Sequence, residues 1–255
     1  MFLKEVIYHM KNTKFNRIII IILILCSIIF FVLQQLFFHD IHESEFLIFQ
    51  DLLFLPIEIL LVTFILDKVL HNREKKQRLE QLNTLIGVFF NEMGNNIITL
   101  LNPYISNLKD VQELLNIKSD WEDKDFNDTI KKIRSYSFKA DYTLEELEQL
   151  KSDLLRKKTS LIQIFNNPSL FEHDTFSNML WALYHLINEL ENRLDISFLP
   201  ATDISHLSGD IVRAYGLLIP EWLMYMNHLK KNYPYLWSLA LRSNPFAPNN
   251  SIIIK

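Results

Sequence analysis

The sequence contains only 1 cysteine, 4 glycines and 8 prolines among 255 residues. The single thiol, Cys26, cannot form an intrachain disulfide, as expected for a protein whose main domain lies in a reducing compartment. Tight turns and phosphate-binding loops use glycine because it adopts backbone conformations that other residues avoid. The shortage of glycine therefore argues against a Rossmann or P-loop nucleotide site and against a β-sandwich or β-barrel.

An excess of basic charge is also missing, since 26 basic and 30 acidic residues leave a net charge of −4. Proteins that bind the phosphate backbone usually carry a basic field, so no nucleic-acid partner is expected. The chain has no Gly-rich loop, no Cys-x-x-Cys pair and no recognisable serine, histidine and aspartate order. We therefore expect no cofactor, and this absence of motifs favours a protein that is not an enzyme.

Hydrophobic residues make up 49% of the chain and are concentrated between Ile18 and Leu70. Residues 18–38 carry no charge, and at about 1.5 Å per residue they would extend for about 30 Å, the thickness of a hydrocarbon core. The run is long for a cleaved signal peptide and lacks a small-residue cleavage site. Residues 46–70 form a second apolar segment. The sequence therefore predicts an N-terminal transmembrane hairpin over residues 18–70.

The second segment of this predicted hairpin contains Asp51 and Glu58, and a carboxylate near the bilayer centre costs about 2.5–3.5 kcal/mol. In an antiparallel hairpin Asp51 would lie at the depth of Gln34, and Glu58 at the depth of Ser27. Hydrogen bonds between these pairs would offset part of the cost. The other interpretation is that the two acids line an ion or proton path in an oligomer.

Basic residues flank the predicted hairpin on both outer sides, at Lys4, Lys11, Lys14 and Arg17 before it and from Lys68 to Arg78 after it. The short connection between the two segments has none. The positive-inside rule then places both termini in the cytoplasm and predicts a multi-pass protein of the cell (inner) membrane, in contact with the lipid bilayer.

The remaining sequence predicts an all-α cytoplasmic helical bundle over residues 71–243, between a short amphipathic segment (1–17), the hairpin and a flexible tail (244–255). The second apolar segment should continue as one helix to Pro103, because its apolar residues keep helical spacing. Other predicted helices cover 105–117, 128–136, 143–166, 174–194, 202–220, 221–231 and 234–241. Thr143 to Glu146 reads as a capping box, and Thr202 or Asp203 as a helix N-cap.

Two pairs of residues could bind a metal ion through their spacing. His206 and Asp210 lie four apart, with Asp203 and Arg213 on the same helical face, although an amphipathic helix explains that polar stripe without any site. His185 and Glu189 repeat the spacing. Two such pairs on facing helices suggest a di-metal helical bundle, but the Glu-x-x-His motif of those proteins is absent.

An aromatic-rich segment contains Trp222, Tyr233, Tyr235 and Trp237. Such residues favour either a surface for a protein partner or packing in the core of the bundle. The segment also carries a family resemblance, through YMNHLKKNYPYL (225–236), RSNPF (242–246) and FLPIE (54–58). These runs resemble an uncharacterised prokaryotic family of two-transmembrane-helix proteins with a helical cytoplasmic domain. The resemblance implies no activity, substrate or site.

These observations lead to a membrane-anchored helical interaction or signalling module without catalytic activity, with a protein partner or a second copy of the chain as its target. The alternative is an oligomeric ion channel or proton-linked membrane protein that uses Asp51 and Glu58. The sequence does not specify the ligand, the oligomeric state or the biological process.

Overall fold

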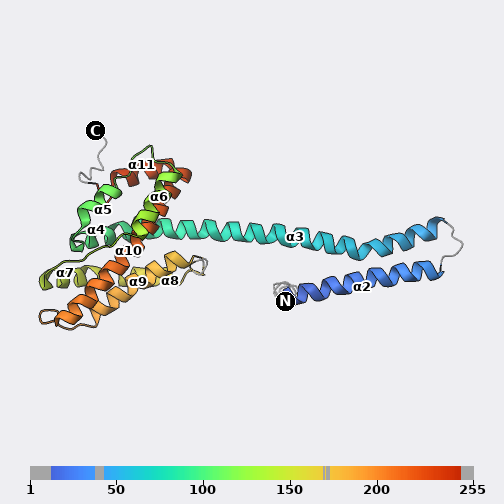
Figure 1. Cartoon of the computed structure of the whole chain (residues 1–255), viewed down its shortest axis with the longest axis horizontal. Coiled ribbons are helices and arrows are strands. Elements are labelled where there is room, and N and C mark those ends of the chain that lie inside the picture. The colour runs from blue at the N-terminus through green and yellow to red at the C-terminus, as the bar shows by residue number, and fades with distance from the viewer. Residues whose placement is uncertain (1–12, 38–42, 169, 171–172, 248–255) are drawn as a thin grey trace. The chain divides into compact units, whose positions relative to one another are not determined.

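The computed structural model describes residues 13–37, 43–168, 170 and 173–247, with only part of the side chains in the first two helices (Figure 1). These residues form helices and connecting turns, with one isolated bridge between Ile105 and Ala140. The predicted all-α class is therefore confirmed for the described chain. The elements are α2 (Thr13–Phe37), α3 (Glu43–Phe89), η1 (Phe90–Gly94), α4 (Asn95–Leu101), η2 (Asn102–Tyr104), α5 (Leu108–Leu114), α6 (Asp123–Arg134), α7 (Leu144–Leu155), α8 (Lys158–Phe165), α9 (Asp174–Glu191), α10 (Ala201–Asn232) and α11 (Pro234–Arg242).

The chain divides into two compact units, Met1–Lys76 and Gln77–Lys255. The first unit contains α2 and most of α3, so both predicted apolar segments are helical. Most of the large apolar side chains described there are exposed, from Ile18 to Leu70. Pro56 lies inside α3, where it removes one backbone hydrogen bond without ending the helix.

Among the helices of the described residues, none is long and apolar enough to cross a membrane. Helix α3 carries Asp51, Glu58 and Asp67 along its apolar segment. The predicted transmembrane hairpin over 18–70 is therefore corrected to a pair of helices. The predictions of a multi-pass inner-membrane localisation and of a membrane protein depended on this hairpin and are not supported either.

The predicted continuation of the second segment to Pro103 is confirmed, with one irregularity. A five-residue π-helix, η1, separates α3 from α4. At Gly94 a Cβ atom would lie 2.5 Å from a ring carbon of Phe90 and 2.8 Å from one of Phe89. Only glycine fits this position, because any side chain would displace two buried aromatic rings.

The C-terminal unit is built around α10, which packs on α9, α6 and α11 (Figure 1). The sequence predicted a break in α10 at Pro220, but the helix continues to Asn232 with Pro220 buried inside it. A proline costs a helix about 3 kcal/mol, and burial of fourteen residues of α10 offsets that cost. The predicted helix over 143–166 is instead two helices, α7 and α8, and α6 begins at Asp123 rather than near Asp128.

Two local predictions at helix ends had different outcomes. The capping box at α7 is confirmed, since the Thr143 hydroxyl accepts from the Glu146 amide at 3.2 Å and Glu146 accepts from the Thr143 amide at 2.7 Å. The predicted cap of α10 at Thr202 or Asp203 is wrong, because Pro200 is the N-cap and makes no side-chain hydrogen bond. The side chain of Asp203 binds Arg193 instead.

A ladder of buried and part-buried hydrogen bonds fixes α10 against η1, α4 and η2. Tyr225 donates to Asn91 at 2.7 Å, Trp222 donates to Asn95 at 3.0 Å and Tyr215 donates to Asn102 at 2.7 Å. Burial raises the pKa of Tyr225 to about 12, so its hydroxyl remains a donor at neutral pH. Since the residue numbers rise on one element and fall on the other, these bonds set an antiparallel register.

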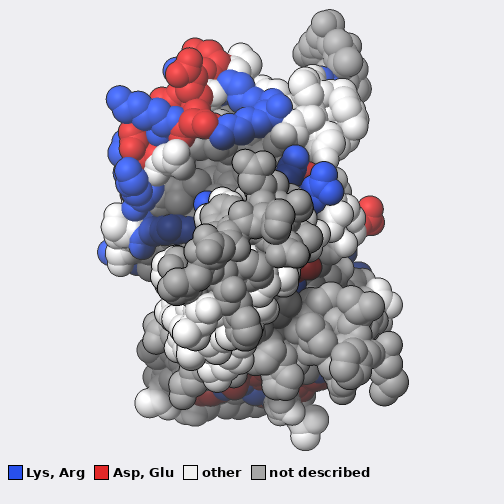
Figure 2. All heavy atoms as spheres, turned by 90° about the vertical axis from the view of Figure 1, so that its right-hand side faces the viewer, with Lys and Arg blue, Asp and Glu red and all other residues white. Residues whose placement is uncertain are grey.

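The surface of the molecule shows no segregation of charge on the face drawn in Figure 2. Basic and acidic side chains gather there in the same region, so neither sign dominates the described surface of that face. The expectation that the chain has no nucleic-acid partner is not tested by this view and stays a prediction. The start of the predicted flexible tail is packed, because Asn244 and Phe246 are buried.

Candidate functional site: a histidine and carboxylate cluster between α9 and α10

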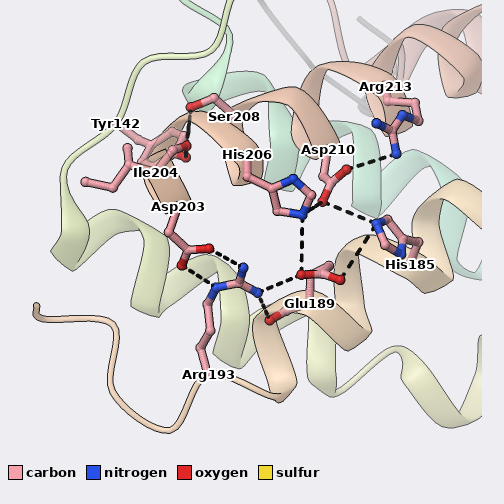
Figure 3. A network of polar contacts seen from close by, with 10 residues as sticks. All are labelled: Tyr142, His185, Glu189, Arg193, Asp203, Ile204, His206, Ser208, Asp210 and Arg213. Carbon is pink, nitrogen blue, oxygen red and sulfur yellow. Dashed lines mark hydrogen bonds and ion pairs between the residues drawn. The ribbon is translucent and has the colours of Figure 1, made fainter. Parts of the chain in front are cut away.

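The site lies where α9 and α10 pack together as an antiparallel helix pair joined by residues 192–200 (Figure 3). His185 and Glu189 lie one turn apart on α9, and His206 and Asp210 lie one turn apart on α10. Because the two helices run in opposite directions, each histidine faces the acid of the other helix. The sequence predicted both pairs separately, and the structure brings them together.

The four side chains point toward one another (Figure 3). The Nε2 atom of His185 lies 3.4 Å from Asp210 Oδ2 and 3.9 Å from Glu189 Oε1. The Nε2 atom of His206 lies 3.3 Å from Asp210 Oδ2 and 3.5 Å from Glu189 Oε2. One donor atom each from His185, Glu189 and His206 all lie within 4.8 Å of one another, which is a grouping able to hold a metal ion.

Asp210 is the buried member of the cluster. Its side chain is 1% exposed, whereas the histidine side chains are 44% and 50% exposed. Arg213 Nη1 lies 3.0 Å from Asp210 Oδ1, so the two are an ion pair by distance. Neither carboxylate oxygen has a hydrogen-bond partner of acceptable geometry among the described residues. A buried acceptor left in this state costs about 1–3 kcal/mol, and more when it is charged.

Arg193 holds the other side of the site in place. Its guanidinium donates to both oxygens of Asp203, at 2.7 and 2.6 Å, and to Glu189 Oε2 at 2.9 Å. The hydrogen bonds from Arg193 lower the pKa of Glu189 and the pKa of Asp203, so both carboxylates stay ionised in weak acid. Arg193 follows α9 directly, and Asp203 lies in the first turn of α10, so this bridge ties the two helices together at their connection.

The cluster fits a divalent transition-metal ion by its donors and by its charge. Imidazole nitrogen and carboxylate oxygen are common zinc ligands at about 2.0–2.2 Å, and four donors on such a tetrahedral ion lie about 3.3 Å apart. The four separations that join a histidine Nε2 atom to a carboxylate oxygen, 3.3–3.9 Å, are close to this value, with Glu189 contributing a different oxygen to each histidine. Three carboxylates and two guanidinium groups leave one net negative charge if the histidines are neutral, so the cluster attracts a cation.

The other acids that the sequence singled out lie elsewhere. Asp51 and Glu58 are exposed on α3. Ser27 Oγ is buried and has no hydrogen-bond partner among the described residues, so the expected pair with Glu58 is not formed there. The side chain of Gln34 lies outside the described residues. The ion-path hypothesis depended on a membrane span in α3 and is not carried further.

The aromatic segment divides between core and surface. Trp222 is fully buried and Trp237 is 8% exposed, so neither forms part of a partner surface. Tyr233 and Tyr235 are 40% and 71% exposed and remain available to a partner. Arg193 was not among the site residues that the sequence predicted. Arg193 lies three residues after Leu190 and ten before Asp203, on the short connection between two predicted helices. This position could have indicated that Arg193 reaches the polar face of both helices.

Fold and cluster together define an all-helical protein in which two His-x-x-x-acid pairs meet on facing helices. The chain belongs to the MJ1433 family. Residues 78–242 match the model "Uncharacterized protein MJ1433, C-terminal helical domain", and residues 10–70 match "MJ1433, N-terminal helical domain". The chain is 42% identical over 247 residues to "Uncharacterized protein MJ1433" of Methanocaldococcus jannaschii, covering 96% of this chain and 98% of that protein. No solved structure matches it.

Proposed function

We propose that this protein is a helical interaction or signalling module whose C-terminal domain binds one divalent transition-metal ion. The ion would be held by His185 and Glu189 from α9 and by His206 and Asp210 from α10. The observation that carries the proposal is the buried Asp210 carboxylate, which is directed between two imidazoles and has no well-aligned hydrogen-bond donor among the described residues. A bound cation is the simplest partner that satisfies it.

The donor set favours zinc, and then manganese or iron, over calcium or magnesium. Imidazole nitrogen suits the borderline transition metals, whereas calcium and magnesium prefer shells made of oxygen. The cluster contains no cysteine. Arg193 and Arg213 hold the two carboxylates from outside, as outer-shell groups commonly do in metal sites.

Binding rather than catalysis is the proposed role. With Asp210 as the fourth donor the tetrahedral shell is complete, and closed shells are typical of structural zinc, whereas catalytic zinc keeps an open position. An ion shared by α9 and α10 would lock this helix pair together. Metal binding would then restrict the connection between the helices, where Leu194 and Phe198 are 98% and 89% exposed.

The same contacts allow a metal-free explanation, in which protonated histidines form ion pairs with Glu189 and Asp210. The two explanations differ in stoichiometry and in spectroscopy. A tetrahedral site with mixed nitrogen and oxygen donors gives intense visible absorption when it is loaded with cobalt(II), whereas an ion-pair network gives none.

The test is a cobalt(II) titration of the metal-free full chain, followed by displacement with zinc. We expect visible bands that saturate at one ion per chain and disappear when zinc is added. His185→Gln and His206→Gln should each weaken binding at least tenfold, because each removes one ligand. His228→Gln is the matched control, since this histidine lies on α10 outside the cluster. Absence of the bands, or equal affinity in all three variants, would overturn the proposal.

A further inference from the structure

A cavity of about 250 Å³ lies in the C-terminal unit, separate from the histidine and carboxylate cluster. Its walls come from the part of α3 in this unit, from the residue before α9 and from the second half of α10. The polar side chains of the lining are Asn83, His173, Glu221, Asn227, His228 and Lys231. The space equals that of about eight liquid water molecules, at ~30 Å³ each, which suits a small organic molecule.

Glu221 is the acidic residue of the cavity lining. It lines the cavity and yet is only 2% exposed. Burial raises the pKa of this carboxyl, while a hydrogen bond from Thr175 and the charges of the nearby His173 and Arg134 act in the opposite direction. Keeping an ionised carboxylate at such a place requires a positive or strongly donating partner.

The lysine of the lining is paired with another acid. Lys231 Nζ lies 2.6 Å from Asp123 Oδ1, and Asn227 also hydrogen-bonds Asp123. Since the Asn227 amide nitrogen is the donor to that carboxylate, its carbonyl oxygen is left as an acceptor. The lining therefore offers a carboxylate and an amide oxygen as acceptors, while its lysine is paired with Asp123.

His228 does not supply a fixed positive charge to the lining. Burial and the nearby Lys231 lower the pKa of His228, which favours a neutral ring at physiological pH. His173 Nδ1 accepts the amide of Phe176 at 3.2 Å and so caps α9 as an unprotonated nitrogen.

We propose that this cavity is a binding site for a small organic ammonium ion, whose charged nitrogen pairs with Glu221. The ammonium group supplies three donors, which match the carboxylate and the amide oxygens of the lining. The carbon chain of such a ligand would lie against Met224 and Tyr225, which form the apolar part of the wall. One face of the Tyr225 ring is already covered by Phe90, with centroids 5.0 Å apart. This inference goes beyond the proposed metal site and does not depend on it.

The experiment is a calorimetric titration of the metal-free full chain with 1,4-diaminobutane. Butane-1,4-diol serves as the matched uncharged probe, because it has the same length and can form hydrogen bonds but carries no charge. We expect the diamine to bind at one molecule per chain and the diol to bind at least tenfold more weakly. Glu221→Gln, which keeps the size of the side chain, should reduce diamine affinity by at least tenfold.

His206→Gln is the control that separates this site from the metal site, and it should leave diamine affinity unchanged. Circular dichroism of Glu221→Gln checks that the variant is folded, and its melting temperature should not rise on addition of diamine as that of the unmodified chain does. No heat of binding with the unmodified chain, equal binding of diamine and diol, or full affinity in Glu221→Gln would each overturn the proposal.

Discussion

Helix α10 treats its polar groups differently on the two sides of Ala214. From Tyr215 onward, three aromatic side chains each donate to an asparagine on η1, α4 or η2. Before Ala214, Asp210 is buried and lies 3.0 Å from Arg213, but it has no well-aligned hydrogen-bond donor among the described residues. The aromatic groups are therefore satisfied within the chain, whereas the hydrogen-bonding capacity of the carboxylate is not filled.

This difference separates a structural polar group from one that points to a ligand. Each bond of the aromatic ladder joins two neutral groups, so the ladder fixes register and leaves nothing to add. The cluster around Asp210 has two imidazoles at 3.3–3.4 Å, too far for good hydrogen bonds but close to the spacing of ligands around one ion. Judged by burial alone, the aromatic ladder and the cluster around Asp210 would both have been taken for structural polar groups.

The ladder should show the largest effect on stability. Trp222→Ala is expected to lower the free energy of unfolding by about 3–5 kcal/mol, because it leaves a large void and an unmet Asn95 acceptor. Tyr235→Ala, at a residue 71% exposed, should change it by less than about 0.5 kcal/mol. Urea denaturation of both variants measures this contrast. A small loss in Trp222→Ala would mean that the ladder does not hold α10 in place.

The cluster should show its effect only when metal is present. At a free zinc concentration of 100 times the dissociation constant, the full chain should gain about 2.7 kcal/mol of stability. His206→Gln should gain almost nothing under the same conditions. Thermal unfolding with and without zinc gives both values, and equal stabilisation of the two proteins would place the ion elsewhere.

The Arg193 bridge should appear in the acid limb of the stability curve. Arg193 lowers the folded-state pKa of Glu189 and Asp203, so their contribution is present above the unfolded values near 4 and is lost as the pH falls further. Arg193→Met should reduce stability at pH 7 by about 1–3 kcal/mol and make the loss below pH 4 shallower. An unchanged acid limb in the variant would show that the bridge is not formed in solution.

The smallest expected effect compares one group from each side of Ala214 in α10. Tyr215→Phe should lower stability by about 1–2 kcal/mol, because Asn102 loses a buried donor. Asp210→Asn in the metal-free chain should cost less, because it removes a buried charge as well as the ion pair with Arg213. Denaturant titrations at neutral pH decide the order. A larger loss in Asp210→Asn would mean that the carboxylate is already satisfied without a ligand.

Much of the helical architecture follows from the sequence, because apolar spacing and local signals act over a few residues. The capping box at Thr143 and the continuation of α3 to Pro103 are examples. The break predicted at Pro220 is absent, since the local penalty of proline is overridden by the packing of α10. The apolar runs of α2 and α3 gave correct helices and a membrane hairpin that the described helices do not support.

The sequence predicted the residue pairs of the candidate site but not that the two pairs meet. The spacing of His185 and Glu189, and of His206 and Asp210, placed each pair on one helical face. What the spacing could not give was the register of α9 against α10, which decides that the two pairs meet rather than pass each other. Nor could it give the burial of Asp210, which depends on the surrounding core and separates this residue from the ordinary acids of a solvated helix face.

X-ray absorption spectroscopy of the zinc-loaded full chain tests the metal site most directly. The account predicts four nitrogen or oxygen donors at about 2.0–2.2 Å, with the outer-shell scattering of two imidazole rings. The scattering should fall to one imidazole in His185→Gln. A six-coordinate shell of oxygen without imidazole, in protein that has bound stoichiometric zinc, would contradict the assignment of His185, Glu189, His206 and Asp210 as its ligands.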